Sequence, residues 1–164
     1  MTAVLVALAV MLGSPPPPAP PLAASESEVR VLGDEPVQVA FEVPPETFAD
    51  AEPGRLRIVI EGLVLLRPGA YYHVYLNLPE GQTPDPKGRY FVGNVALFGK
   101  VRADDPGGDR SFDVTDQIAW LREQGEWAGR AELTFIRGNP QPPSAETAAP
   151  EEFVRFRRVA LIRR

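Results

Sequence analysis

Polar and apolar residues alternate along Arg55–Leu78, which carries the clearest periodic pattern of the chain. In the first half of this stretch, three aliphatic side chains share one face: Leu56, Ile58 and Ile60. In the second half, the corresponding face carries Tyr72, Val74, Leu76 and Leu78. A period of two is typical of strands with one buried face. The turn signal Arg67-Pro68-Gly69 between the halves predicts a chain reversal that pairs the two strands as neighbours.

The second of these strands has another face, made of aromatic and polar side chains: Tyr71, His73, Tyr75 and Asn77. The aliphatic face is assigned to the core, so this opposite face is available to meet another molecule. We therefore predict these four residues as a candidate contact face for a partner.

Five further runs have the periodicity of strands, and segments rich in glycine, proline and acidic residues separate them: 29–32, 37–43, 89–98, 130–137 and 153–162. Gly93 predicts a bulge or a close backbone approach in the third run. Regular alternation would place Phe91 and Val95 on one face of that run. In the last run, the same alternation would place on one face Val154, Phe156, Ala160 and Ile162.

One helix is predicted, with Asp113 as its N-cap. Its apolar face carries Val114, Ile118 and Leu121, and Gly125 ends it. The segment 44–54, rich in proline and acidic residues, is expected to be a surface loop. About seven short strands and one short amphipathic helix predict an all-β fold. We expect an antiparallel β-sandwich of Greek-key or jelly-roll type.

The composition limits the possible functions. The chain of 164 residues has a formal net charge of −5, which disfavours nucleic acid and anionic membrane surfaces as partners. It has no cysteine and one histidine, His73, so it lacks the ligands of a zinc or copper site. No G-x-S-x-G motif accompanies that histidine. We therefore predict that the chain is not an enzyme and holds no cofactor of its own.

The N-terminus begins with an apolar run, Val4–Leu12. This run is shorter than the roughly 20 residues of a membrane-spanning helix but suits a signal peptide, and small residues follow at Ala23 and Ala24. We predict residues 1–24 as a signal peptide or an apolar, proline-rich leader, 25–28 as a linker and 29–164 as the folded domain. A signal peptide would export the protein to the periplasm or the extracellular space. Alternatively, Met1 lies inside a longer reading frame, and the segment SPPPPAPP, residues 14–21, is a polyproline-like linker from an upstream domain.

Four ordered blocks carry a resemblance to a known family: RLRIVIEGLVLLRPGAYYHVYLNLPEG, RYFVGNVALFG, SFDVTDQIAWLREQGEWAGRAELTFIRG and FVRFRRVALI. Together they resemble the C-terminal β-sandwich domain of tyrosinases and polyphenol oxidases, over roughly Val29 to Ile162. The segment Tyr72–Asn77 takes the place of the KFDVYVN-type strand of the plant enzymes, with His73 where that strand has an acidic residue.

The resemblance implies a non-catalytic role. In that family the dicopper site, with six histidine ligands, belongs to a separate helical domain. The C-terminal sandwich of the latent plant enzymes packs over the entrance of the copper site and keeps the enzyme inactive. For this chain the resemblance implies an accessory or shielding domain that docks on a dicopper oxidase as lid, stabiliser or maturation partner.

Two other interpretations stay open. In the first, the chain is the detached C-terminal part of a larger tyrosinase-type oxidase. In the second, it is a free-standing sandwich that binds phenols or sugars through the tyrosine face together with Trp120 and Trp127.

Overall fold

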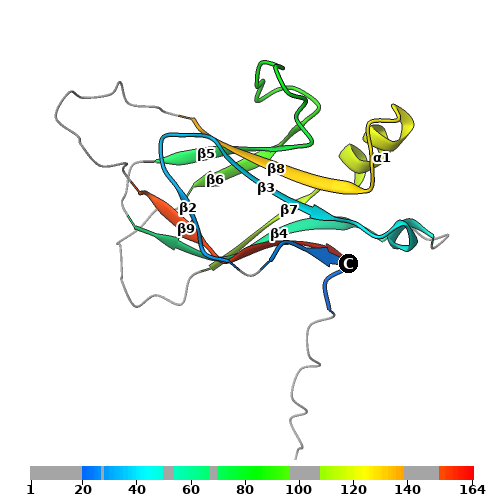
Figure 1. The fold of residues 1–164 in the computed structure, drawn as a ribbon, viewed down its shortest axis with the longest axis horizontal. Helices are drawn as coiled ribbons and strands as arrows, with labels where there is room; N and C mark the ends of the chain where they lie inside the picture. The colour runs from blue at the N-terminus through cyan, green and yellow to red at the C-terminus, as the bar shows by residue number, and fades with distance from the viewer. Residues whose placement is uncertain (1–19, 27, 50–53, 67–69, 97–107, 139–151) are drawn as a thin grey trace, which may run out of the picture.

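The computed structural model describes residues 20–26, 28–49, 54–66, 70–96, 108–138 and 152–164. These residues form two antiparallel sheets with ten strands in all, one short α-helix and one 3-10 turn (Figure 1). The predicted all-β antiparallel sandwich with a single short helix is confirmed. No helix in the described ranges is long and apolar enough to cross a membrane.

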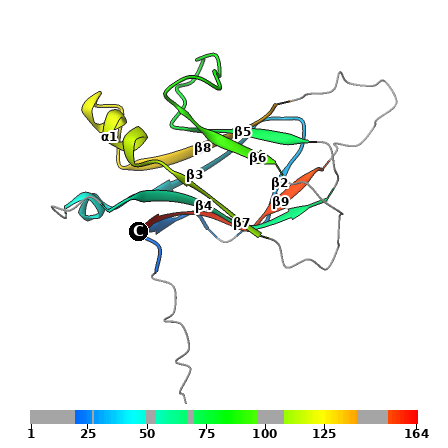
Figure 2. The same ribbon diagram turned by 180° about the vertical axis from the view of Figure 1, so that it is seen from behind.

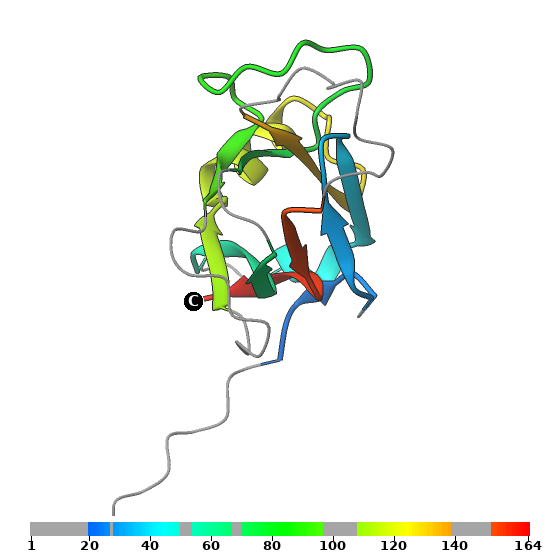
Figure 3. The same cartoon turned by 90° about the vertical axis from the view of Figure 1, so that its left-hand side faces the viewer.

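One sheet contains both ends of the described chain. In order it consists of β1 (Ala23–Ala24), β10 (Arg158–Arg163), β4 (Leu56–Leu65), β9 (Val154–Phe156) and β2 (Arg30–Leu32), and β7 (Gly108–Asp113) also pairs with β4. The other sheet has the order β3 (Val37–Glu42), β8 (Arg130–Arg137), β5 (Tyr71–Leu76) and β6 (Phe91–Ala96). The two sheets face each other around the core (Figure 3), and β6 lies next to β7 where their edges meet (Figure 2).

The two strands of the Arg55–Leu78 stretch do not pair, so the predicted hairpin is wrong. β4 pairs with β7, β9 and β10 in one sheet, whereas β5 lies between β6 and β8 in the other. Both strands bury aliphatic faces, such as Ile58 in β4 and Val74 in β5, in the same core from opposite sides. The period of two shows which face is buried, but it is the same for neighbouring strands and for strands facing each other across a sandwich. The turn signal Arg67-Pro68-Gly69 lies outside the described residues.

Large apolar side chains from both sheets fill the core. Phe135 of β8 and Phe156 of β9 meet at its centre with a ring-centroid distance of 5.2 Å. Tyr72 also lies inside, and its single hydroxyl proton is shared between the carbonyl oxygens of Leu32 (3.1 Å) and Gly33 (3.0 Å). Burial raises the pKa of Tyr72 to about 12, so this phenol stays a neutral donor at physiological pH.

Two irregularities invert the predicted faces of strand residues. In β6 the register shifts between the pairs Val74–Gly93 and Tyr75–Phe91, so Phe91 lies on the outer face against His73 while Val95 stays in the core. The bulge predicted at Gly93 is confirmed, but the expected common face of Phe91 and Val95 is wrong. Each inserted residue turns the following side chains to the other face.

The last predicted strand is likewise divided, at Arg157. Val154 and Phe156 point into the core as expected. Beyond the break, Val159 and Leu161 join the core cluster, whereas Ala160 is buried outside that cluster and Ile162 is only partly buried. Opposite the break, β4 has a register shift of its own, with Gly62 at a φ of 66°. The two irregularities face each other. In both strands, the alternation of core-facing and outward-facing side chains is therefore shifted by one residue at the same level of the sheet.

Gly93 is required because β6 meets β7 at this position. A β-carbon on Gly93 would lie 2.6 Å from Cε1 of Phe112. We expect Gly93→Ala to lower the free energy of unfolding by about 1–3 kcal/mol, because the partly buried ring must move and because the φ of 156° at Gly93 is unfavourable for a residue with a β-carbon. Gly108→Ala is the matched control, since a β-carbon on this residue of β7 would have no atom of the described residues within 4 Å. Urea unfolding curves of the two variants would compare them, and equal losses would contradict the role of Phe112.

The helix α1 (Thr115–Glu123) begins two residues after Asp113, so the predicted N-cap is one residue too early. The carboxylate of Asp113 still accepts hydrogen bonds from the hydroxyl (2.7 Å) and the N–H (3.1 Å) of Thr115, which hold the pKa of Asp113 below its usual range. The predicted apolar face is confirmed, because Val114, Ile118 and Leu121 are buried. Gly125, at a φ of 73°, follows the end of the helix as expected.

The segment 22–25 is part of the fold. β1 pairs with β10, the N–H of Leu22 donates to the carbonyl of Leu161 at 2.8 Å, and the N–H of Ser25 donates to that of Val159 at 2.9 Å. Ala23 and Ala24, where the predicted leader ends, are therefore strand residues. The domain boundaries at 24 and 28 and the export of the protein stay predictions.

Glu61 forms an ion-pair cluster beside the strand irregularities. Its carboxylate accepts two hydrogen bonds from Arg158 (2.8 and 3.0 Å) and one from Arg157 (3.1 Å). The hydrogen bond from Arg158 is the main cause that lowers the pKa of Glu61, and its effect exceeds the opposing effect of burial.

The lowered pKa of Glu61 makes the cluster sensitive to acid. The folded protein binds this proton more weakly than the unfolded chain, so the stabilisation is complete above the ordinary pKa of 4.5 and is lost as pH falls through the lower folded value. We expect the difference in thermal midpoint between wild type and Glu61→Gln to be constant from pH 7 to about 5.5 and to shrink below pH 4.5. A difference that grows toward acid would contradict this assignment.

Candidate interaction surfaces

The predicted contact face of β5 is a row of rings on the outer side of its sheet. The ring of Tyr71 meets that of His73 edge-on at 5.3 Å, and His73 is 6.4 Å from Tyr75. Phe91 of β6 completes the row at 5.7 Å from both His73 and Tyr75. Regular alternation places Phe91 on the same face as Val95, which the structure shows to be a core residue, so the bulge hid this member of the row from sequence analysis.

His73 is held within this row by a polar contact. Its Nδ1 lies 2.7 Å from Oδ1 of Asn94 on β6, which fits the tautomer with the proton on Nδ1. Tyr71 is fixed at its hydroxyl, which donates to the carbonyl of Gly138 at 3.1 Å. Both side chains are partly exposed, and the structure brings them together, with His73 in the middle of the row.

Tyr75 contributes little surface to this face, and the side chain of Asn77 is engaged with backbone groups. Tyr75 is only 1% exposed, and its burial, together with the nearby negative charge of Asp85, raises its pKa. Asn77 has a positive φ of 48°, and its side-chain amide donates to the carbonyl of Arg130 (3.0 Å) and accepts from the N–H of Glu132 (2.8 Å). These bonds continue the pairing of β5 with β8. A partner role for the four predicted residues stays a prediction.

The described residues offer no group of three or more histidine, cysteine, aspartate or glutamate side chains that would hold a metal ion. With a single histidine and no cysteine in the whole sequence, the six-histidine dicopper site of the tyrosinase-type enzymes is not in this chain.

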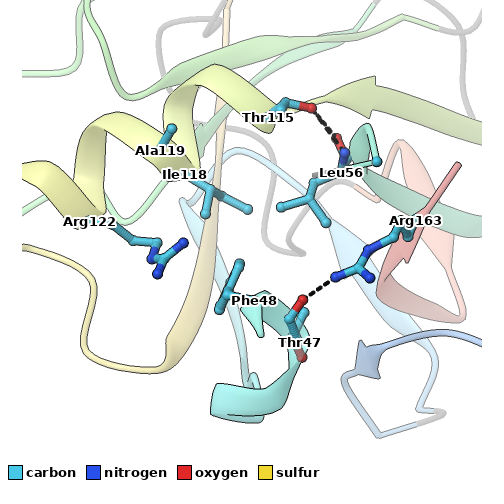
Figure 4. Close-up of a pocket in the computed structure, with 9 residues that line it drawn as sticks. Thr47, Phe48, Leu56, Thr115, Ile118, Ala119, Arg122 and Arg163 are labelled. Atoms are coloured by element: carbon cyan, nitrogen blue, oxygen red, sulfur yellow. Dashed lines mark hydrogen bonds between the residues drawn. The ribbon is translucent and has the colours of Figure 1, made fainter. Parts of the chain in front are cut away.

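A second surface lies at the end of the sandwich, between the 3-10 turn η1 (Pro45–Phe48) and α1 (Figure 4). Here a cavity of about 90 Å³ opens between the two elements and the ends of β4 and β10. Apolar side chains line most of it, among them Phe48, Leu56 and Ile118. Two guanidinium groups, those of Arg122 and Arg163, point toward it from opposite sides.

A wider depression of about 410 Å³ adjoins this cavity, and Phe48 and Arg122 line both. The guanidinium of Arg122 lies over the ring of Phe48 at 4.6 Å from its centroid. On its other side Phe48 meets Trp127 edge-on at 5.6 Å, and Trp127 lines the wider depression. We call the cavity and the depression together the η1–α1 groove.

The two tryptophans face different neighbours. Trp120 packs edge-on against Tyr90 at 5.4 Å, and the guanidinium of Arg89 lies 6.0 Å from its ring. Trp127 belongs to the η1–α1 groove, with Phe48. The hydroxyl of Tyr90 donates to the carboxylate of Glu126 at 2.8 Å.

The amino-acid sequence matches a family model over residues 18–162, and that family is described as "Domain of unknown function (DUF7868)". The chain belongs to this family. The match includes β1 at its beginning and nearly all of β10 at its end, so the DUF7868 domain is the sandwich described above. No curated protein matches the sequence.

Solved structures show where else this fold occurs. The DUF7868 domain is similar to part of a latent aurone synthase (polyphenol oxidase) from natural source, with a TM-score of 0.55 and 13% identity, over 81% of this chain and 25% of that chain. It is also similar to a recombinantly expressed latent aurone synthase (polyphenol oxidase), with a TM-score of 0.54 and 12% identity, over 85% of this chain and 28% of that chain. The chain thus spans about a quarter of the polyphenol oxidase chains that it matches. The resemblance to the polyphenol oxidase C-terminal domain is confirmed for the fold.

Sequence reasoning missed the η1–α1 groove of the DUF7868 domain. Phe48 lies in the segment expected to be a surface loop, and Arg122 lies on the polar side of the helix. The available signal was an aromatic residue inside a proline-rich loop, since such a residue needs a surface to pack against.

Proposed function

We propose that this chain is a non-catalytic accessory domain that docks on a dicopper oxidase as lid, stabiliser or maturation partner. The observation that carries the proposal is the fold, which corresponds to about a quarter of two latent polyphenol oxidase chains. In tyrosinases and polyphenol oxidases the copper chemistry belongs to a separate helical domain. A sandwich without histidine clusters therefore suits a role beside such a domain and not in its place.

The detached-domain alternative rests on the same coverage. A chain that matches only part of the solved oxidases is also what the end of a larger oxidase would look like. Six-histidine helical sequence upstream of Met1 in the same reading frame would favour this alternative. A stop codon with a ribosome-binding site before Met1 would reject it.

Co-purification tests the proposal directly. The dicopper oxidase encoded nearest to this gene would be expressed with and without the chain, and its diphenolase rate would be measured in both samples. We expect a complex that survives size-exclusion chromatography and a changed rate on addition of the chain. The matched control is Val74→Asp, which is expected to unfold the sandwich and abolish both effects. Absence of a complex together with an unchanged rate would refute the proposal.

A further inference from the structure

The η1–α1 groove has a shape suited to an extended segment of polypeptide. Its cavity, at about 90 Å³, has room for one apolar side chain, and the depression of about 410 Å³ continues beside it across the Phe48–Arg122 wall. Pockets for drug-sized ligands have volumes of roughly 300–1,000 Å³ and bury most of the ligand. A small anchor cavity beside an open depression is instead typical of grooves in which successive side chains occupy separate subsites.

The charge of the groove selects for an acidic ligand. Two arginines, Arg122 and Arg163, line the cavity, and no carboxylate is among the described residues that line either part of the groove. Within the described part of the chain, no carboxylate lies within 4 Å of the guanidinium of Arg122. The chain as a whole has a net charge of −5, so the positive charge of Arg122 contrasts with the average surface. An arginine beside an aromatic ring is well suited to bind a carboxylate.

The walls of the groove are held in place before any ligand arrives. Arg163 donates a hydrogen bond to the carbonyl of Thr47, which ties the end of β10 to η1 (Figure 4). The N–H of Leu56 donates to the hydroxyl of Thr115 at 2.9 Å and thereby ties β4 to the start of α1. Phe48 is fixed between Arg122 and Trp127. A groove that is already ordered costs less free energy to occupy.

We propose that the η1–α1 groove binds an acidic-apolar segment of the partner protein. An apolar side chain of that segment fills the cavity against Leu56 and Ile118, a neighbouring carboxylate pairs with Arg122, and a second apolar side chain packs on Trp127. The proposal rests on the docking function proposed above and identifies the surface and the chemistry through which docking occurs.

Short peptides test the groove without the oxidase. The probe is acetyl-Leu-Glu-Phe-amide, the charge control is acetyl-Leu-Gln-Phe-amide, and 3-phenylpropionate represents a free aryl carboxylate. Titrations followed by ¹⁵N–¹H NMR would monitor the indole N–H of Trp127, assigned by comparison with Trp127→Phe. We expect the acidic peptide to shift this signal, and not that of Trp120, with an affinity about five- to tenfold higher than that of the glutamine peptide. Equal affinities for the two peptides would overturn the charge assignment.

The free carboxylate distinguishes a polypeptide from a small molecule. We expect 3-phenylpropionate to bind more weakly than the acidic peptide, because it occupies fewer of the subsites. Binding as tight as that of the peptide would overturn the polypeptide as occupant.

Arginine variants extend the test to the complete partner. Arg122→Gln should lower the affinity for the acidic peptide and for the oxidase about five- to tenfold. Arg155 is an exposed arginine on β9, and Arg155→Gln should leave both affinities unchanged. If wild type forms a complex that Arg122→Gln does not weaken, the groove is the wrong surface and the docking function still stands. If wild type forms no complex, the docking function fails, and with it the groove as the site of docking.

Discussion

Val74→Asp is expected to remove most of the stability of the domain. Val74 has no exposed surface and lies in β5, the strand between β6 and β8. A carboxylate at this position would be buried among apolar side chains with no partner, which costs about 4 kcal/mol or more and is comparable to the whole stability of many domains. Far-ultraviolet circular dichroism during urea titration would show a strongly lowered midpoint or no cooperative transition.

The neighbouring residue provides the control for this variant. His73 points to the opposite face, so His73→Ala removes the hydrogen bond to Asn94 and ring contacts but leaves the core intact. We expect a loss of about 1 kcal/mol or less. Similar losses for the two variants would mean that β5 does not bury the face assigned to it.

Asp34→Ala is expected to have the next largest effect, because it leaves a buried cation unpaired. The side chain of Arg137 is 3% exposed and that of Asp34 is 46% exposed, and the Nη1 of Arg137 donates to the carboxylate of Asp34. The guanidinium also lies over the ring of Phe153, at 4.2 Å from its centroid. Removing one partner of a buried pair costs about 3–5 kcal/mol, and the half-exposed carboxylate reduces our expectation to about 2–3 kcal/mol.

A double-mutant cycle would separate the interaction energy of the Asp34–Arg137 ion pair from the free-energy cost of burying the charge of Arg137. Arg137→Met keeps an unbranched apolar side chain in the core, and Asp34 is then left in contact with water, so this variant should lose less than Asp34→Ala. The double variant should be more stable than Asp34→Ala alone. Urea midpoints of the four proteins would measure the cycle. A larger loss of stability for Arg137→Met than for Asp34→Ala would contradict the expectation that an unpaired buried Arg137 costs more than an unpaired, half-exposed Asp34.

The strands and the helix were predictable because their side chains follow simple periodicities. The run 130–137 became β8 with its bounds unchanged, and the buried face of α1 matches Val114, Ile118 and Leu121. In both cases the alternation is unbroken, so local pattern and tertiary burial agree.

Pairing was harder to predict than the strands themselves. The period of Arg55–Leu78 identified β4 and β5 but assigned them to one hairpin, whereas the structure places them in opposite sheets. Hydrogen-bond partners depend on the whole sheet order, and the partners of β4 lie more than 40 residues away along the chain. Local sequence contains no information on such contacts.

Of the candidate surfaces, the sequence predicted the row on β5 but not its burial or the η1–α1 groove. Tyr75 was assigned correctly to the outer face, yet it is covered there, and alternation alone cannot show what lies over a face. The groove requires η1, α1 and the ends of β4 and β10 to meet. Its residues are spread from Val43 to Arg163, so no short motif contains it.

The pairing of β1 with β10 has a consequence for the order of events during synthesis. Ala23 pairs with Leu161, and Val37 of β3 pairs with Phe135, so each sheet joins residues made early to residues made late. Contacts between such distant residues make folding slow, because a long loop must close before they form. While residues near 161 are still inside the ribosome, β4 lacks β9 and β10 along one edge. The sheet is therefore completed only after β10 has left the ribosome, and until then one edge of β4 is unpaired, which is the kind of edge that favours aggregation.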